Sequence, residues 1–290
     1  MSRRRMLQST LAGTALASSS PLAWTQEKTA TPAAPMQRKG RIQQSVSRWC
    51  YPSMTLDELS AYAAQIGCKG VDLLKPEEFE APKKYGLICT MGYADAGTIP
   101  DALNVVANHD KIEEGLRKNI PLAAKAGVPN VITFSGNRRG MSDEEGARNV
   151  ILGLNRVKKI AEDNNVVLNL ELLNSKVNHK DYMADHTAWG VAVMKEVNSP
   201  HVKLLYDIYH MQIMEGDLIA TIKENIQWLG HFQTGGVPGR HELNNTQEVQ
   251  WDGVMRGIVE TGYKGYVAHE FVPTGDPKTS LLQAVDLCDV

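Results

Sequence analysis

The stretch VVLNLELLN at residues 166–174, followed by VKLLYD at residues 202–207, decides the fold class of this chain. Each is a short run of apolar and β-branched residues, which is typical of a strand buried on both faces of a parallel sheet. Each also carries a carboxylate at or near its end, Glu171 in the first and Asp207 in the second. The pair therefore predicts a parallel sheet with acidic residues at the carboxyl ends of its strands.

The same alternation of strand-like and helix-like runs extends over the chain from Ile42, and counting the runs decides the architecture. Helical runs are expected to begin near Thr55, Pro76, His109, Ser142, Met183, Asp217 and Trp251, with a last one after Asp276. Eight strands and eight helices favour a single closed (β/α)8 TIM barrel over an open doubly wound sheet, and no GxGxxG follows the first strand. The eight expected strands are Gln43–Trp49, Gly70–Leu74, Leu87–Gly92, Asn130–Phe134, Val167–Leu172, Val202–Asp207, His231–Thr234 and Tyr266–Phe271.

Several helix ends carry explicit signals. TLDE at residues 55–58 and SDEE at residues 142–145 each place a hydroxyl three residues before a glutamate, which predicts capping boxes. Glycines that follow helical runs just before a strand are expected to adopt the left-handed conformation that ends a helix. These glycines are Gly67, Gly127, Gly230 and Gly262.

Length and charge bound the class of protein. The 290 residues carry a formal net charge of −2, with acids and bases interspersed, so no basic stripe for a nucleic acid is evident. One barrel-sized domain, residues 40–290, is the simplest fit. The four cysteines have no CxxC spacing and are interpreted as buried apolar side chains.

The N-terminus has the layout of a twin-arginine export signal. SRRRMLQ at residues 2–8 is followed by a weakly apolar run over residues 11–17, which is too short for a stable membrane anchor. Residues 18–39 are rich in Ser, Thr, Pro and Ala, which predicts a flexible linker. We therefore expect export, to the periplasm or beyond, by the twin-arginine machinery; the alternative is a disordered basic tail.

Four consecutive strands end in oxygen-bearing side chains, and in such barrels chemistry takes place at the strands' carboxyl ends. Each residue alone could simply cap the next helix. Together, three carboxylates and an amide converging on one barrel mouth would repel one another unless a cation were present, and an all-oxygen set suits Mg²⁺ or Mn²⁺. The four side chains are those of Glu171, Asp207, Gln233 and Glu270.

The flanking motifs add a resemblance. DIYHMQ at residues 207–212, EGD at 215–217, HFQ at 231–233 and VPGRHE at 237–242 strongly resemble the hydroxypyruvate isomerases, within the wider group of xylose isomerase-like barrels. The resemblance implies that Glu171, Asp207, Gln233 and Glu270 bind one divalent metal ion. It also implies that Glu171 and Glu270 form the acid/base pair and that His210 and Arg240 contact the substrate. Related ketose 3-epimerases usually have His in place of Gln233.

Other polar and aromatic residues have more than one interpretation. His231 lies on the same strand face as Gln233, where it would orient a ligand or contact substrate. His269 alternates with Glu270, which predicts a structural position facing the helices. Trp49 and Tyr93 are expected in the core more often than in a pocket wall. NRR at residues 137–139 is equally an anion site or a surface loop.

These observations predict an isomerase or epimerase that acts on a small hydroxy-carbonyl or sugar-like substrate through a cis-enediolate. Interconversion of hydroxypyruvate and tartronate semialdehyde is the best single guess. The alternatives are a ketose 3-epimerase, a phosphodiesterase resembling endonuclease IV, and a non-catalytic sugar-binding barrel. Zinc phosphodiesterases of this fold need many histidines and basic loops, which this sequence does not offer. Self-association into a homo-oligomer is compatible with the sequence.

Overall fold

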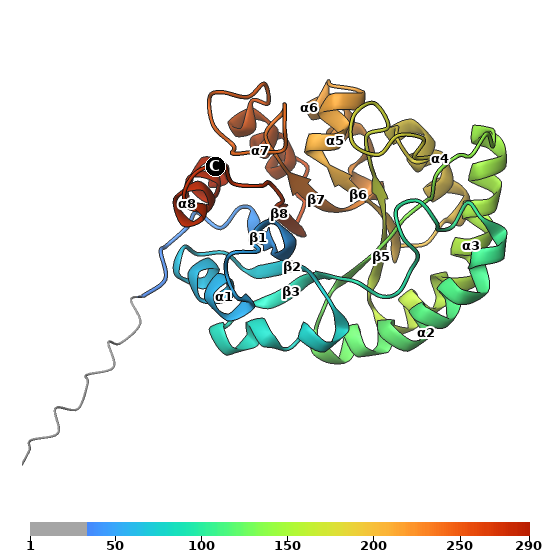
Figure 1. Cartoon of the computed structure of the whole chain (residues 1–290), viewed down its shortest axis with the longest axis horizontal. Helices are drawn as coiled ribbons and strands as arrows, with labels where there is room; N and C mark the ends of the chain where they lie inside the picture. Colours follow the sequence, from blue (N-terminus) through green and yellow to red (C-terminus); the bar gives the residue numbers. More distant parts are fainter. Residues whose placement is uncertain (1–33) are drawn as a thin grey trace, which may run out of the picture. The chain divides into compact units, whose positions relative to one another are not determined.

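Eight parallel strands close into a barrel in their order along the chain. The computed structural model describes residues 34–290, and within them the expected (β/α)8 TIM barrel is confirmed (Figure 1). Every expected strand is present, with ends that differ from the expectation by no more than two residues. The strands are β1 Gln43–Ser47, β2 Gly70–Leu74, β3 Ile88–Gly92, β4 Asn130–Thr133, β5 Val167–Leu172, β6 Val202–Asp207, β7 Leu229–Thr234 and β8 Tyr266–His269.

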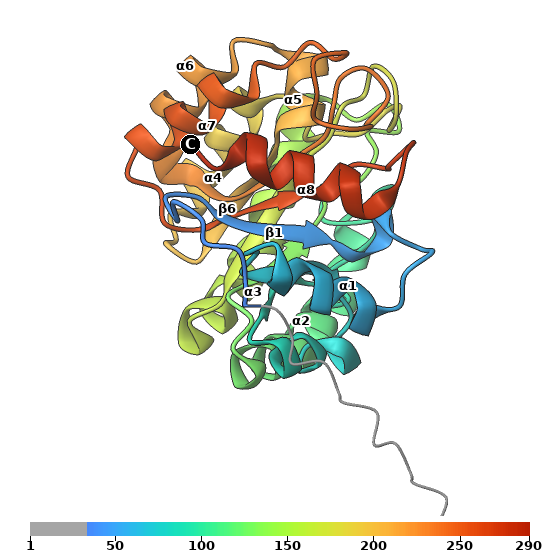
Figure 2. The same cartoon turned by 90° about the vertical axis from the view of Figure 1, so that its left-hand side faces the viewer.

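The α-helices form the outer layer of the barrel. In Figure 1, α2 and α3 follow one another along its outer side, and in Figure 2 the C-terminal helix α8 runs beside β1. Short 3-10 turns occur at Arg48–Cys50, Pro76–Glu78, Ala81–Tyr85, Val106–Asn108 and Ile226–Trp228. The α-helices are α1 Leu56–Gln65, α2 His109–Ala126, α3 Asp143–Asn164, α4 Thr187–Val197, α5 Ile208–Met214, α6 Leu218–Asn225, α7 Trp251–Glu260 and α8 Pro277–Cys288.

The helix-end signals act largely as expected. Thr55 and Glu58 form the full capping box of α1, and the Ser142 side chain accepts the backbone N–H of Glu145 at the start of α3. Of the four glycines expected in the left-handed conformation, three adopt it, with φ of 89° at Gly67, 75° at Gly127 and 77° at Gly262. These contacts satisfy backbone groups that a helix end leaves without partners.

The expectation for Gly230 is wrong. This residue lies inside β7 and not at a helix end. A Cβ atom at this position would lie 2.2 Å from Oδ1 of Asn169 on β5, so packing explains the glycine.

Two helix predictions also need correction. No α-helix begins at Pro76, because Pro82 lacks a backbone N–H and its ring would clash with the carbonyl four residues earlier; two short 3-10 turns take its place. The helix expected near Met183 begins only at Thr187, since the Met183 N–H donates to Gly136 O in a loop. In addition, α5 was not expected; it begins directly after Asp207.

The pairing of the strands shows which side chains face the barrel interior. Leu205 is paired with Glu171 on one side and with His231 on the other, and Asp207 is paired with Gln233. Paired neighbours share a face of a sheet, and residues two apart on one strand share it as well. The strand-end side chains of β5, β6 and β7 therefore all point inward.

The remaining structural expectations concern buried residues and the chain's first part. All four cysteines are free and buried, as expected. His269 is buried between Thr234 and Gln44, which confirms its structural position. Within the described residues, the Met36 N–H donates to Gln65 O, while the expected export signal and most of the expected linker lie outside them. Among residues 34–290, no helix is long and apolar enough to cross a membrane.

Candidate active site

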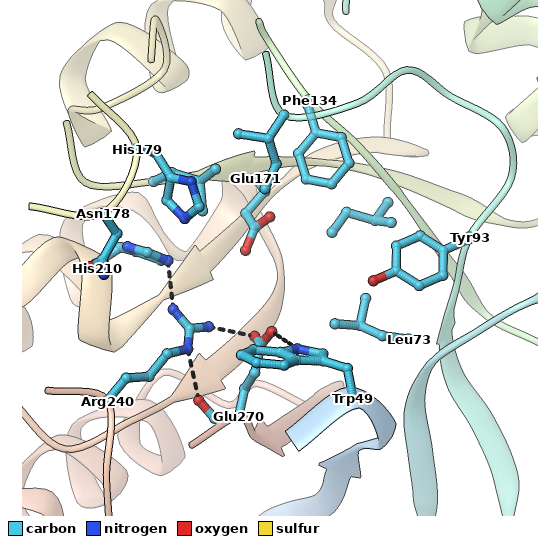
Figure 3. Close-up of a pocket in the computed structure, with 13 residues that line it drawn as sticks. Trp49, Leu73, Tyr93, Phe134, Glu171, Asn178, His179, His210, Arg240 and Glu270 are labelled. Carbon is cyan, nitrogen blue, oxygen red and sulfur yellow. Dashed lines mark hydrogen bonds and ion pairs between the residues drawn. The ribbon is translucent and has the colours of Figure 1, made fainter. Parts of the chain in front are cut away.

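A cavity of about 410 Å³ lies at the carboxyl ends of the strands. Four of the seven expected site residues line it: Glu171, His210, Arg240 and Glu270. Figure 3 shows these polar side chains facing an apolar side of the cavity formed by Leu73, Tyr93 and Phe134. The other three expected residues, Asp207, Gln233 and His231, are fully buried and do not line the cavity.

Asp207 both caps a helix and belongs to the charged cluster. Its Oδ1 accepts the backbone N–H groups of Tyr209 at 2.8 Å and His210 at 3.3 Å, which fixes the start of α5. Its Oδ2 lies 2.7 Å from Nη2 of Arg240. The helix-cap alternative is therefore correct for one oxygen, while the other oxygen pairs with Arg240 within the site.

The two glutamates are buried close to other negative charges. Burial raises the pKa of Glu171 well above its ordinary value, and the charges of Glu270 and Asp207 raise it further. Burial likewise raises the pKa of Glu270 to about 7, although Arg240 and a hydrogen bond from Trp49 act in the opposite direction. Buried carboxylates whose protonated forms are favoured in this way are suited to acid/base catalysis near neutral pH and respond strongly to a nearby cation.

Arg240 brings positive charge into the middle of this cluster. Its Nη2 contacts Asp207 Oδ2 and also lies 2.9 Å from Glu270 Oε2, while its Nε donates to the Glu270 carbonyl at 3.1 Å. The guanidinium lies over the rings of Tyr209 and Trp49, at 5.0 and 5.7 Å from the ring centres. The side chain is only 12% exposed, so the alternative of a solvated loop arginine is wrong.

Both ring nitrogens of His210 face hydrogen-bond donors. The backbone N–H and the side-chain amide of Asn174 lie 3.1 and 2.6 Å from Nδ1, and a backbone N–H can only donate. Burial lowers the pKa of His210 well below its ordinary value, which favours the neutral ring. Nε2 lies 2.7 Å from Arg240 Nη1, and a guanidinium can only donate. A neutral imidazole has a single acceptor nitrogen, so one of these contacts opposes two donors, and an acceptor oxygen of a substrate beside it would satisfy them.

Sequence reasoning missed Asp72, which connects to two of the expected residues. Asp72 lies on β2, is fully buried, and is within 3.2 Å of both His231 Nε2 and Gln233 Nε2. The available signal was an acidic residue inside the apolar strand GVDLL at residues 70–74. Asp72 stands in the middle of its strand and so lacks the strand-end position that marks the other candidates.

The cavity wall contains further residues that were not assigned to the site. Trp49 is 45% exposed, lines the cavity and donates its indole N–H to Glu270 Oε1, and Tyr93 also lines the cavity. Asn178 and His179, from the loop after β5, complete the polar side. The NRR segment at 137–139 is engaged elsewhere, since Arg138 pairs with Asp185 and Arg139 pairs with Asp101.

The donor set fits a divalent cation. Glu171, Asp207 and His210 each offer a ligand atom, and these atoms lie within 4.8 Å of one another. Gln233 Oε1 is buried and has no hydrogen-bond partner among residues 34–290. The Arg240 guanidinium already lies between the carboxylates of Asp207 and Glu270, so the cluster accommodates positive charge.

A closed parallel barrel with buried acidic side chains at its strand ends can be compared with known proteins. The model of the xylose isomerase-like TIM barrel family matches residues 61–288, and the chain belongs to this family.

Two curated relatives are similar in sequence to more than half of this chain. A putative hydroxypyruvate isomerase from Homo sapiens is 28% identical over 168 residues, which cover 56% of this chain and 61% of the relative. The chain thus spans about six tenths of that relative's length. Hydroxypyruvate isomerase from Escherichia coli is 25% identical over 225 residues, which cover 73% of this chain and 85% of the relative.

Among solved structures, the AP endonuclease of family 2 from Brucella melitensis superimposes with a TM-score of 0.75. The match covers 83% of this chain and 97% of that structure at 22% sequence identity. This likeness shows the shared fold.

Proposed function

We propose that this chain is a metal-dependent isomerase of a small hydroxy-carbonyl compound or sugar, with the interconversion of hydroxypyruvate and tartronate semialdehyde as the first reaction to test. One observation carries the proposal: two buried glutamates, Glu171 and Glu270, reach one cavity from different strands beside a cluster suited to a cation. The similarity to proteins called hydroxypyruvate isomerase supports the same reaction class.

The proposed cation is Mg²⁺ or Mn²⁺, held by Glu171, Asp207, Gln233 and Glu270. When bound, it would supply Lewis acidity to the adjacent oxygens of the substrate. His210 is close enough to Glu171 and Asp207 to serve as a further or an alternative ligand. The buried position of all these side chains would exclude water from the reacting atoms.

The glutamates would move the proton between two substrate carbons. One carboxylate takes a proton from the carbon beside the carbonyl, which leaves a cis-enediolate, and a carboxyl group then returns a proton to the neighbouring carbon. A proton also passes between the two substrate oxygens, so the product is an isomer and no redox cofactor is needed. The Arg240 guanidinium, beside His210, would donate to an oxygen of the substrate and so hold it in place. Acid/base catalysis of this kind typically contributes about 10²- to 10⁴-fold in rate.

A ketose 3-epimerase is the second candidate, and the size of the cavity favours it. A volume of about 410 Å³ falls within the usual range of small-molecule pockets, about 300–1,000 Å³, and leaves room beyond a three-carbon acid. The apolar side of the cavity, with Leu73, Ile132 and Phe134, would contact the far carbons of a longer sugar. Both candidates remove a proton from a carbon beside a carbonyl. An isomerase returns a proton to the neighbouring carbon, whereas a 3-epimerase returns it to the opposite face of the same carbon.

A phosphodiesterase is less well supported. Among the described residues that line the cavity, Arg240 is the only arginine or lysine, and it is paired with two carboxylates. A polyanionic substrate would be repelled by this acidic centre unless several cations were bound.

The deciding experiment is a substrate panel in D₂O. Hydroxypyruvate, tartronate semialdehyde and C4–C6 ketoses are incubated with the purified protein and Mg²⁺ or Mn²⁺, and deuterium incorporation is followed by NMR. An isomerase or epimerase incorporates deuterium at the carbon that receives the proton, and a chelator stops the incorporation. Binding of sugars without any exchange would show a non-catalytic barrel, and cleavage of abasic DNA would show a phosphodiesterase.

Export by the twin-arginine route is a separate part of the proposal. It is supported by the sequence of residues 2–17 alone. Replacing Arg3 and Arg4 by lysine should retain the protein in the cytoplasm in a cell-fractionation assay. Equal export of the variant and the original chain would contradict the proposal.

A further inference from the structure

Asp72 forms a polar bridge across the inside of the barrel. Its Oδ1 accepts the hydroxyl of Thr90 on β3 at 2.7 Å, and its Oδ2 lies 3.2 Å from both His231 Nε2 and Gln233 Nε2 on β7. Asp72 and its three partners are fully buried. Because β2 and β7 are not neighbours in the barrel, these contacts pass through its interior and not along the sheet.

This bridge determines the orientation of the Gln233 amide. An amide has a donor end and an acceptor end of nearly equal size, and either end can point in either direction. A carboxylate only accepts hydrogen bonds, so Asp72 draws the NH₂ group of Gln233 towards itself. The acceptor end, Oε1, then points away from Asp72 and has no hydrogen-bond partner within the described part of the chain.

Gln233 and the proposed metal ligand Asp207 share the interior face of the barrel. Gln233 is paired with Asp207 in adjacent strands, so both side chains leave the sheet on the interior face. If the amide turned over, its NH₂ group would take the place of the oxygen and would repel a cation. His231 is oriented by the same carboxylate, with its Nε2 directed at Asp72.

We propose that Asp72 is a positioning residue, which holds the Gln233 amide with its oxygen towards the cation site. The proposal rests on the proposed metal site and assigns to Asp72 no contact with the substrate. Partners that orient a metal ligand in this way typically contribute about 10- to 100-fold to metal affinity.

The test measures Mn²⁺ binding to the full chain, after removal of metal by a chelator, with the free ion followed by electron paramagnetic resonance. D72N keeps the shape of the side chain and adds a donor, so the Gln233 amide can turn over. We expect the Kd for Mn²⁺ to rise by about 10- to 100-fold. D185N makes the same chemical change at a buried carboxylate that pairs with Arg138 away from the cavity, and it should leave the Kd unchanged.

A swap variant separates orientation from charge. In D72N/Q233E the acid and the amide exchange places, so the network keeps its net charge, and the new amide donates to one oxygen of the new carboxylate while the other oxygen stays free. We expect this variant to recover most of the Mn²⁺ affinity that D72N loses and to bind more tightly than Q233E alone. If D72N does not fold, the comparison of Q233E with the double variant still decides the question.

The outcomes separate this proposal from the proposed function. If the original chain binds no Mn²⁺, the metal site and the role of Asp72 are both overturned. If the original chain binds Mn²⁺ and D72N binds within about twofold of it, well short of the expected loss, the metal site stands and the role of Asp72 is overturned. A double variant no better than Q233E would also overturn it.

Discussion

Glu242 offers a quantitative test of how the loop that carries Arg240 is held. Its carboxylate accepts the backbone N–H groups of Thr274 at 2.7 Å and Gly275 at 3.0 Å, and the hydroxyls of Thr274 and Ser280 at 2.9 Å. Burial acts to raise the pKa of Glu242, but the hydrogen bonds outweigh it and lower the pKa from 4.5 to about 2. The carboxylate therefore links the loop after β7 to the loop before α8.

The magnitude follows from this shift. A difference of about 2.5 pKa units corresponds to about 3.4 kcal/mol at 1.36 kcal/mol per unit. Because Glu242 is partly exposed, solvent screening reduces this free energy. We expect E242Q to have an unfolding free energy lower by about 1–2 kcal/mol at pH 7. For a domain of this size that corresponds to a Tm lower by about 2–8 °C.

The dependence on pH has a definite sign. Since the pKa is lower in the folded state, the contribution of Glu242 is fully present above the unfolded pKa of about 4.5 and disappears as the pH falls through about 2. The difference in Tm between the original chain and E242Q should therefore shrink from pH 6 to pH 2.5, as measured by circular dichroism. E260Q removes an exposed glutamate paired with Lys223 and should leave Tm unchanged. A pH-independent difference, or none at pH 7, would refute the reasoning.

Three further predictions concern the site and the barrel. E171Q and E270Q should each reduce isomerisation by at least about 10²-fold while the far-UV circular dichroism stays unchanged, and turnover equal to the original chain's in either variant would contradict the proton-transfer roles. Treatment with a chelator should abolish activity and lower Tm, with both restored by Mn²⁺ but not by Na⁺; activity that persists without divalent metal would exclude the proposed cofactor. G230A introduces a Cβ that would lie 2.2 Å from Asn169 Oδ1, so urea unfolding should show an unfolding free energy lower by about 1–3 kcal/mol. Unchanged stability would show that the residues around Gly230 shift to make room for the Cβ.

The site residues that sequence reasoning found share one property: they terminate apolar strands. Glu171, Asp207 and Glu270 could be recognised because a carboxylate at the end of a buried run is conspicuous. Asp72 has no such position, and its partners His231 and Gln233 lie 159 and 161 residues away along the chain. The burial of Arg240 was also beyond reach, because it depends on a loop in which this residue adopts a φ of 59°.

Errors in the expected helices have local causes that tertiary contacts reveal. A helix was expected from near Met183. Arg138 and Ser175 instead hold Asp185 in a loop, so α4 begins only at Thr187. The helix after β6 was missed because a helix was expected only from Asp217, whereas Asp207 caps α5 with one oxygen and pairs with Arg240 through the other.

The sequence by itself determined the order of strands and helices and the polar residues at the strand ends, because both follow from local periodicity and from the boundary between apolar and polar runs. Only the tertiary structure decided which atoms those polar groups meet. Closing the barrel brings β2 opposite β7, so that Asp72 meets Gln233, and it places Arg240 between Asp207 and Glu270. Such contacts depend on the three-dimensional path of the whole chain, and no segment specifies them alone.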